Sequence, residues 1–123
     1  MKNISILIVD DSESFRDLIT EFLNQQSEVG EVYTASSGKE SIDLLEKFAP
    51  NVVLMDIVMP EMNGFEASEQ IRKKMPAVPI IILSGNEVTD SRDVIAKMGL
   101  NGFVQKVNVV SELMPAIFKS LRK

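Results

Sequence analysis

Short apolar runs alternate with amphipathic segments along the chain. Five runs have the length of β-strands, and they are Ile4–Val9, Glu31–Ala35, Val52–Met55, Pro79–Leu83 and Gly102–Lys106. The first, third and fourth are almost wholly apolar, which is typical of parallel strands that helices cover on both faces. The second and fifth are more polar, which suits the edges of a sheet.

The segments between these runs have helical spacing. The first apolar stripe follows an i, i+3, i+4, i+7, i+8 pattern through Phe15, Leu18, Ile19, Phe22 and Leu23. Four further helices are predicted, and their signals are a capping box of Ser37 and Glu40, one face with Gly64, Ser68, Ile71 and Met75, a segment Asp90–Met98 ended by Gly99, and the apolar set Leu113, Met114, Ile117 and Leu121.

Pro115 lies inside the last helical segment. Proline is tolerated only near the start of a helix, because it lacks an N–H and its ring clashes with the preceding turn. The last helix is therefore predicted to begin around Ser111.

The order of these elements predicts the fold class. Five βα units in a row predict an α/β domain with a five-stranded parallel sheet, right-handed crossovers and five helices on its two faces. We see no internal repeat, low-complexity stretch or linker, so residues 1–123 are expected to form one domain.

Composition removes several classes of function. The chain has no cysteine and no histidine, which excludes disulfides, thiolate chemistry, phosphohistidine on this chain and the usual general base. The formal net charge of -5, without a dense basic run, argues against direct nucleic-acid binding. No apolar run approaches the roughly 18 residues of a membrane span, and no signal peptide is expected, because the apolar run Ile4–Val9 is too short and two aspartates follow it. We expect a soluble cytoplasmic protein.

Polar residues lie at or just after the ends of four predicted strands. Asp10 and Asp11 follow the first strand, Asp56 the third and Ser84 the fourth, while Lys106 ends the fifth. In open parallel sheets ligands bind beyond the carboxyl ends of the strands. We therefore expect three acids, a hydroxyl and an ammonium group to converge on one crevice.

Each of these residues taken alone has a simpler interpretation. Asp10 or Asp11 could cap the first helix. Asp56 could form a turn, Ser84 could bond to nearby backbone, and Lys106 could be a solvated strand end.

The set of residues favours a functional site. Three neighbouring carboxylates repel one another and raise each other's pKa unless a cation compensates. Mg²⁺ with oxygen ligands is the natural compensation, with Lys106 supplying further positive charge, and such a site suits phosphoryl transfer. A P-loop is excluded because GxxxxGK[ST] is absent, and a flavodoxin-type phosphate loop is excluded because Asp10 and Asp11 would repel phosphate.

Four segments carry a resemblance to a known family: ILIVDDSESFR, VVLMDIVMPEMNGFE, PIIILSG and GFVQK. In this order and spacing the chain resembles the receiver domain of two-component response regulators, over nearly its whole length. The resemblance implies a flavodoxin-like sheet with strand order 2-1-3-4-5. Val107 and the segment SELMPAI resemble receivers of the LuxR/NarL-type regulators.

The resemblance implies roles for the residues at the strand ends. Asp56 would accept a phosphoryl group from a sensor histidine kinase or a phosphotransfer protein. Asp11 and Asp56 would bind Mg²⁺ directly, or Mn²⁺ in its place, with Asp10 acting indirectly. The backbone carbonyl of Val58 would be a further ligand.

The resemblance also implies a signalling switch rather than an enzyme, since the domain would catalyse only its own phosphorylation and dephosphorylation. Ser84 and Lys106 would bind the new phosphoryl oxygens, and Phe103 would be a switch aromatic that moves inward. Pro60, Asn63 and Gly64 would shape the loop after Asp56. The face formed by the fourth helix, fifth strand and fifth helix would then bind a target protein or a second copy.

Three positions depart from the family pattern or bear on the kinetics of dephosphorylation. Val107 replaces the usual proline after the lysine, and a non-proline cis bond costs about 2.5–4 kcal/mol, so the Lys106–Val107 peptide is predicted to be trans with a short, altered loop after it. Val58 and Asn86 occupy positions that influence dephosphorylation, and apolar Val58 predicts a long-lived phosphoryl state.

Three hypotheses remain open from the sequence. The chain is a phosphorylatable receiver, either a single-domain regulator or an excised part of a larger one; or a degenerate receiver that only binds partners; or a Mg²⁺-dependent phosphatase or transferase for small molecules. The full set of site residues argues against the second, and the missing histidine argues against the third.

Overall fold

The computed structural model describes residues 3–85, 96–97 and 99–122. Along the chain the elements are β1 (Ile4–Val9), α1 (Glu13–Asn24), β2 (Val29–Ala35), α2 (Gly38–Leu44), β3 (Val52–Asp56), α3 (Gly64–Lys74), β4 (Ile80–Ser84), β5 (Gly102–Gln105), the 3₁₀ turn η1 (Lys106–Asn108) and α5 (Val109–Leu121). The fourth helix expected at Asp90–Met98 lies outside the described residues except at Ala96 and Lys97, which are helical.

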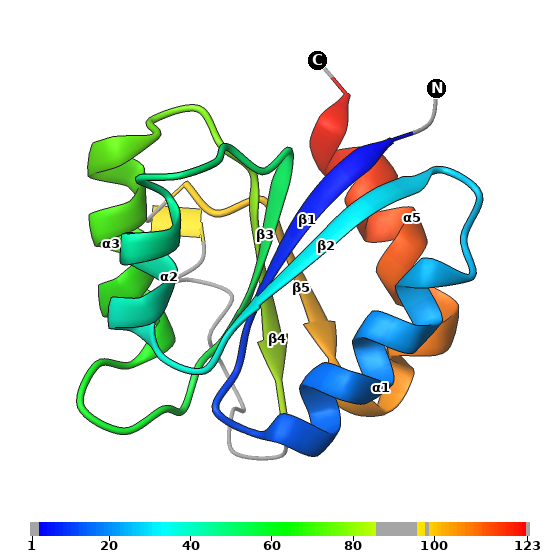
Figure 1. The fold of residues 1–123 in the computed structure, drawn as a ribbon, viewed down its shortest axis with the longest axis horizontal. Coiled ribbons are helices and arrows are strands. Elements are labelled where there is room, and N and C mark those ends of the chain that lie inside the picture. Colours follow the sequence, from blue (N-terminus) through cyan, green and yellow to red (C-terminus); the bar gives the residue numbers. More distant parts are fainter. Residues whose placement is uncertain (1–2, 86–95, 98, 123) are drawn as a thin grey trace.

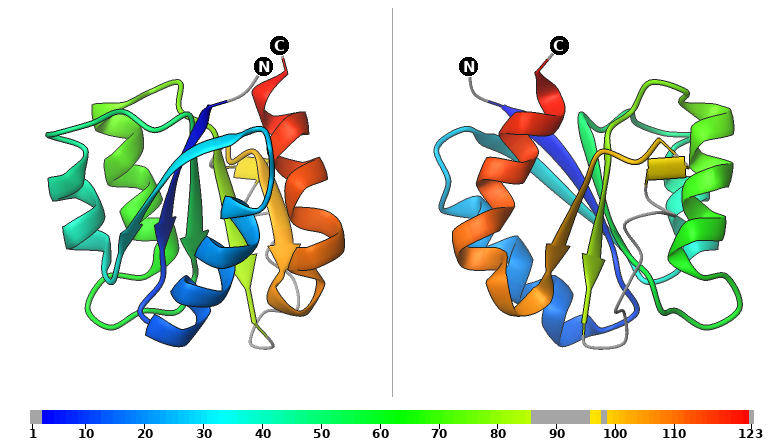
Figure 2. Two further views of the ribbon diagram at one scale, coloured as in Figure 1. Left: turned by 45° about the vertical axis from the view of Figure 1, so that its right-hand side comes forward. Right: turned by 180° about the vertical axis from the view of Figure 1, so that it is seen from behind.

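All five strands are parallel and follow the order β2-β1-β3-β4-β5. This order confirms the prediction, including the placement of the two more polar strands at the edges. α1 and α5 cover one face of the sheet, and α2 and α3 cover the other (Figure 1). Both termini lie at the end of the sheet opposite the carboxyl ends of the strands (Figure 2).

The three central strands alternate between two apolar cores. In β1, Ile6 and Ile8 face the helices α1 and α5, whereas Leu7 and Val9 face α2 and α3. Because helices cover both faces, every residue from Ile6 to Val9 is fully buried, although successive side chains point to opposite faces. The unbroken apolar runs in the sequence therefore have a direct structural cause.

The carboxyl ends of three strands differ from the prediction. β5 ends at Gln105, one residue earlier than expected, so Lys106 is the first residue of η1 and not the last residue of the strand. β3 ends at Asp56 and β4 at Ser84, one residue later than expected in each case. These two polar residues thus belong to the hydrogen-bonded sheet rather than to the loops after it. The backbone pairing of the strand therefore fixes where their side chains begin.

The side-chain caps at the starts of α2 and α3 differ from the prediction. Ser37 accepts a hydrogen bond from the Glu40 N–H at 3.1 Å, but the Glu40 carboxylate bonds to the N–H of Ser36, so the expected capping box is only half formed. A complete capping box occurs instead at Asn63 and Glu66, at the start of α3.

The last helix begins at Val109, two residues before the predicted start, which places Pro115 in its second turn. Proline cannot donate to the carbonyl of Ser111. Both residues are exposed, so water can reach that carbonyl, which explains why the proline is tolerated.

Candidate functional site

Parallel strand register brings the predicted site residues together. Val9 pairs with Met55, so Asp10 and Asp56 leave β1 and β3 side by side. On the other side Asp56 pairs with Leu83, and Ser84 pairs with Gln105, the residue before Lys106. The sheet therefore places these residues next to one another at its carboxyl edge, at the bottom of Figure 1.

Three carboxylates form a cluster at this edge. Ligand oxygens of Asp10, Asp11 and Asp56 all lie within 4.8 Å of one another. Asp10 is fully buried and Asp56 is 3% exposed, whereas Asp11 faces solvent. The cluster is therefore buried at Asp10 and Asp56 and open to solvent at Asp11.

The start of α1 holds the buried acid in place. The Asp10 Oδ1 accepts a hydrogen bond from the Ser12 N–H at 2.8 Å, and the Arg16 guanidinium donates to the Asp10 carbonyl at 2.7 Å. Ser12, and neither aspartate, is the N-cap of α1. The capping interpretation of Asp10 and Asp11 is therefore wrong, and both carboxylates are left for the crevice.

Lys106 inserts its ammonium group between two of the acids. Its Nζ lies 2.8 Å from the Asp10 Oδ2 and 3.2 Å from the Asp56 Oδ1, and its side chain is 23% exposed. Nζ also lies 4.5 Å from the centroid of the Phe15 ring. From the sequence Phe15 is predicted only as part of an apolar stripe, and this contact is not predicted. The available signal was its position three residues after a serine N-cap that directly follows Asp10 and Asp11.

The ionisation of the site follows from this packing. Burial, together with the charge of Asp10, raises the pKa of Asp56 to about 6, against the opposing effect of Lys106. Burial alone would lower the pKa of Lys106, but its pairing with Asp10 and Asp56 outweighs this and leaves the pKa above its ordinary value. Lys106 is therefore positively charged at neutral pH.

The donor set fits a hard divalent cation. Three clustered carboxylates and one ammonium leave two uncompensated negative charges when all are ionised, which a divalent ion would balance. Oxygen-only ligands and an open side for water match the preference of Mg²⁺. The site residues thus fit the predicted metal, although coordination by the Val58 carbonyl stays a prediction.

Two further predicted residues, Ser84 and Phe103, lie on β4 and β5. Ser84 is fully buried, and its hydroxyl donates to the Gly85 carbonyl at 3.3 Å. Phe103 is half-buried in β5 and packs against the core beneath α2 and α3. Their switching roles remain predictions. Asn86, which is predicted to influence dephosphorylation, lies outside the described residues.

Two loops frame the site. The described part of the chain has no cis peptide bond, so the Lys106–Val107 bond is trans as predicted. η1 leads from Lys106 directly into α5, which confirms the short connection, and Val107 is 82% exposed. On the other side, a Cβ on Gly64 would lie 2.0 Å from the Asp56 carbonyl oxygen, so only glycine lets α3 start this close to β3.

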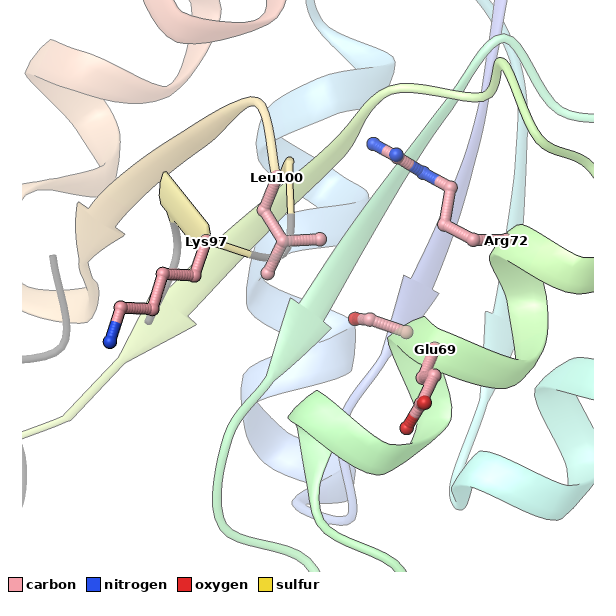
Figure 3. A pocket seen from close by; sticks show the side chains of 5 residues that line it. Glu69, Arg72, Lys97 and Leu100 are labelled. Atoms are coloured by element: carbon pink, nitrogen blue, oxygen red, sulfur yellow. The ribbon is translucent and has the colours of Figure 1, made fainter. Parts of the chain in front are cut away.

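A separate cavity of about 360 Å³ lies between α3 and the segment before β5 (Figure 3). Glu69 and Arg72 line it from α3, and Lys97 and Leu100 line it from the opposite side. The Arg72 Nη2 already donates to the Gly99 carbonyl and to Asn101, so it ties α3 to the start of β5. This cavity contains none of the acids at the carboxyl edge.

Comparison with known proteins decides the family. The model of the response regulator receiver domain matches residues 6–118. The chain belongs to the response regulator receiver domain family. Its strand order and its acidic crevice are those expected of a receiver from the four sequence segments.

Three similar proteins illustrate the range of this family. The receiver is 33% identical over 121 residues to the response regulator protein VraR of Staphylococcus saprophyticus, covering 95% of this chain and 56% of that protein. It is 43% identical over 94 residues to a protein-glutamate methylesterase/protein-glutamine glutaminase of Methanococcus maripaludis, covering 72% of this chain and 26% of that protein. A two-component response regulator of the LuxR family from Aurantimonas superposes with a TM-score of 0.87 at 26% identity, covering 98% of this chain and 86% of that one.

The similarity to the LuxR-family regulator from Aurantimonas agrees with the predicted resemblance to LuxR/NarL-type receivers. The receiver spans about half the length of VraR and about a quarter of the methylesterase. In the described part of the chain no helix is long and apolar enough to cross a membrane. A cytoplasmic location stays a prediction.

Proposed function

We propose that this receiver is phosphorylated on Asp56 in a Mg²⁺-dependent reaction, with a phosphohistidine of a sensor kinase or a phosphotransfer protein as donor. One observation carries the proposal. The buried Asp56 carboxylate lies 3.2 Å from the Lys106 ammonium group, inside a cluster with Asp10 and Asp11. A nucleophile, a cation for the transferring oxygens and an acidic metal site thus share one crevice.

The transfer is a displacement at phosphorus. A carboxylate oxygen of Asp56 bonds to phosphorus while the bond between phosphorus and the donor's imidazole nitrogen breaks, and the electron pair stays with that nitrogen. Asp56 must be ionised to attack, and a pKa of about 6 leaves it mostly ionised at pH 7. The Lys106 ammonium pairs with a phosphoryl oxygen and keeps its contact with Asp10.

Asp10, Asp11 and Asp56 are the residues that would hold Mg²⁺, with the Val58 carbonyl as a further ligand. The bound ion would supply positive charge where negative charge gathers on the transferring oxygens. Because Asp11 is the exposed member of the cluster, it forms the open side through which a hydrated ion can enter.

The proposed output is a change in partner binding. After transfer the Ser84 hydroxyl turns from the Gly85 carbonyl to a phosphoryl oxygen, and Phe103 moves inward. This would bias the face formed by the fourth helix, β5 and α5 toward a target protein or a second copy of the chain. Such a receiver is a switch, and catalysis beyond its own phosphorylation and dephosphorylation would belong to other domains, as the methylesterase relative illustrates.

Incubation with Mg²⁺ and a small phosphoryl donor, followed by intact mass, tests the proposal. We expect a gain of one phosphoryl group that is lost in Asp56→Asn. Asp43→Asn is the matched control, because Asp43 is an exposed acid on α2, paired with Lys39, and it should keep the gain. A gain retained in Asp56→Asn would refute the assignment. No gain with any donor would favour a degenerate receiver, and turnover of the donor without a covalent product would favour a small-molecule phosphatase.

A further inference from the structure

The Phe15 ring gives Lys106 a contact that involves neither carboxylate. Nζ lies 4.5 Å from the ring centroid, within the range in which an ammonium group is attracted to the negative face of an aromatic ring. Asp10 and Asp56 hold the same ammonium group at 2.8 and 3.2 Å. Lys106 is therefore held by three groups, of which one is uncharged.

The contact with the uncharged ring differs from the two carboxylate contacts in how it responds to phosphoryl transfer. Both carboxylates belong to the cluster that would bind the metal, and Asp56 would itself be modified, so their hold on Lys106 changes during the reaction. Phe15 is not one of the acids that would bind the ion or be modified, so neither event removes the ring as a partner of the ammonium group. A lysine side chain with four flexible methylenes and 23% exposure gains most from such a fixed contact.

The ring itself is held by the loop that carries the acids. The Ser12 hydroxyl caps α1 by accepting from the Phe15 N–H at 3.3 Å, and the Ser12 N–H donates to Asp10. Arg16, the next residue along, ties the helix to the Asp10 carbonyl. One hydrogen-bonded turn therefore fixes the positions of both the buried acid and the ring, and each of them contacts the ammonium group.

We propose that Phe15 is a positioning residue for the phosphorylation reaction, whose ring keeps the Lys106 ammonium group directed at Asp56 while the charges around it change. The proposal rests on the function proposed above, since it concerns the group that meets the transferring phosphoryl oxygens. It goes beyond that function by assigning a role to an aromatic residue that otherwise belongs to the apolar core.

The first test measures the position of Lys106 without any reaction. In lysine-labelled, metal-free protein, the Lys106 ε-methylene signal should be shifted by the ring, and its order parameter should exceed that of exposed Lys39. Phe15→Leu should abolish the ring shift and lower the order parameter. Phe15→Tyr, which keeps an aromatic ring, should retain both the shift and the order parameter of the parent protein. Phe22→Leu is the matched control, because Phe22 lies two turns along α1 and packs against the same core. An order parameter unchanged in Phe15→Leu overturns the proposal, whether or not the protein is phosphorylated.

The second test measures the rate of phosphorylation by a small donor with Mg²⁺. Phe15→Leu should slow it about 3- to 30-fold, the range expected for loss of a partly buried cation–π contact. Phe15→Tyr and Phe22→Leu should stay within about twofold of the parent rate. In a Lys106→Met background, Phe15→Leu should have no further effect, because the ring acts only through the ammonium group.

The two tests distinguish failure of the proposed function from failure of the positioning role of Phe15. If the parent protein gains no phosphoryl group, the proposed function fails, and the order parameter still decides whether the Phe15 ring holds the Lys106 ammonium group. If the parent reacts and Phe15→Leu reacts as fast, only the positioning role fails. An equal loss of rate in Phe22→Leu, or an undiminished loss in the Lys106→Met background, would show that Phe15 acts through the core and would also overturn the proposal.

Discussion

Leu54 in the middle of β3 and Asp56 at its end are two residues apart, and both are almost fully buried, with exposures of 0% and 3%. The surroundings of the two side chains differ completely. Leu54 packs in an apolar core beneath α1 and α5, whereas Asp56 faces two other carboxylates and one ammonium group. The centre and the carboxyl edge of one sheet thus bury opposite chemistry to nearly the same extent.

The difference shows what burial does to each kind of group. Removing apolar surface from water stabilises the fold, by about 25 cal/mol for each Å². Burying a carboxylate disfavours its ionised form, which raises the pKa of Asp56 to about 6. The centre of the sheet therefore supplies the stability that lets the edge hold a destabilised, reactive group.

The largest expected effect is a loss of stability when the apolar centre of the sheet is disrupted. Leu54→Ala should lower the free energy of unfolding by about 2–5 kcal/mol, because it removes buried contacts and leaves a cavity. Urea unfolding measures this. Leu18→Ala is the matched control, since Leu18 is 57% exposed on α1, and its effect should stay within about 0.5 kcal/mol. Equal effects for the two variants would contradict the assignment of Leu54 to the core.

The second largest effect is expected at the carboxyl edge, where a substitution should stabilise the protein instead of destabilising it. Asp56→Asn should raise the free energy of unfolding of the metal-free protein by about 1–3 kcal/mol at pH 7, because it removes a buried charge that two neighbouring acids repel. The folded-state pKa of Asp56 lies above its unfolded value, so its contribution favours folding below about pH 4 and is lost as the pH rises to about 6. The advantage of the variant should therefore appear across that window.

Urea unfolding of both proteins in chelator, from pH 4 to pH 7, measures this difference. Asp43→Asn should leave the pH profile close to that of the parent, because Asp43 is exposed and paired with Lys39. A variant that is less stable than the parent at pH 7 would show that the pairing of Asp56 with Lys106 outweighs the cost of its burial.

The two regions also differ in how far the sequence predicted them. The centre was predicted almost completely, because strands covered on both faces leave unbroken apolar runs, and the more polar strands marked the edges. At the carboxyl edge the residues were predicted, but not their relation to the backbone. Asp56 and Ser84 are the last residues of their strands, and Ser12 caps α1 in place of the aspartates.

Contacts between distant segments account for what the sequence could not predict. Phe15 and Lys106 are far apart in the chain, and each also fits a simpler role, in an apolar stripe and at a strand end. Only the register of β4 and β5 and the start of α1 bring the ring and the ammonium group together. The start of α5 at Val109 was missed because the rule against proline inside a helix does not take its exposure into account.

The smallest effect comes from compensating the charge of the edge. Mg²⁺ at ten times its dissociation constant should raise the free energy of unfolding by about 1.4 kcal/mol, because it binds the folded cluster only. Asp11→Asn should lose most of this gain, and Asp17→Asn, which changes an exposed acid on α1, should keep it. An equal gain from NaCl at matched ionic strength would point to general screening instead of a bound ion.

Mg²⁺ and Asp56→Asn also provide a joint test of the comparison. Both relieve repulsion within the same cluster, so their stabilising effects should not add: Mg²⁺ should raise the free energy of unfolding of Asp56→Asn by less than that of the parent. In Leu54→Ala, by contrast, Mg²⁺ should add its full increment, because the cavity lies in the apolar core and leaves the carboxylates unchanged. If the effect of Mg²⁺ on stability adds to that of both substitutions, repulsion between the carboxylates does not destabilise the edge. If it adds to neither, the centre and the edge do not contribute independently to stability.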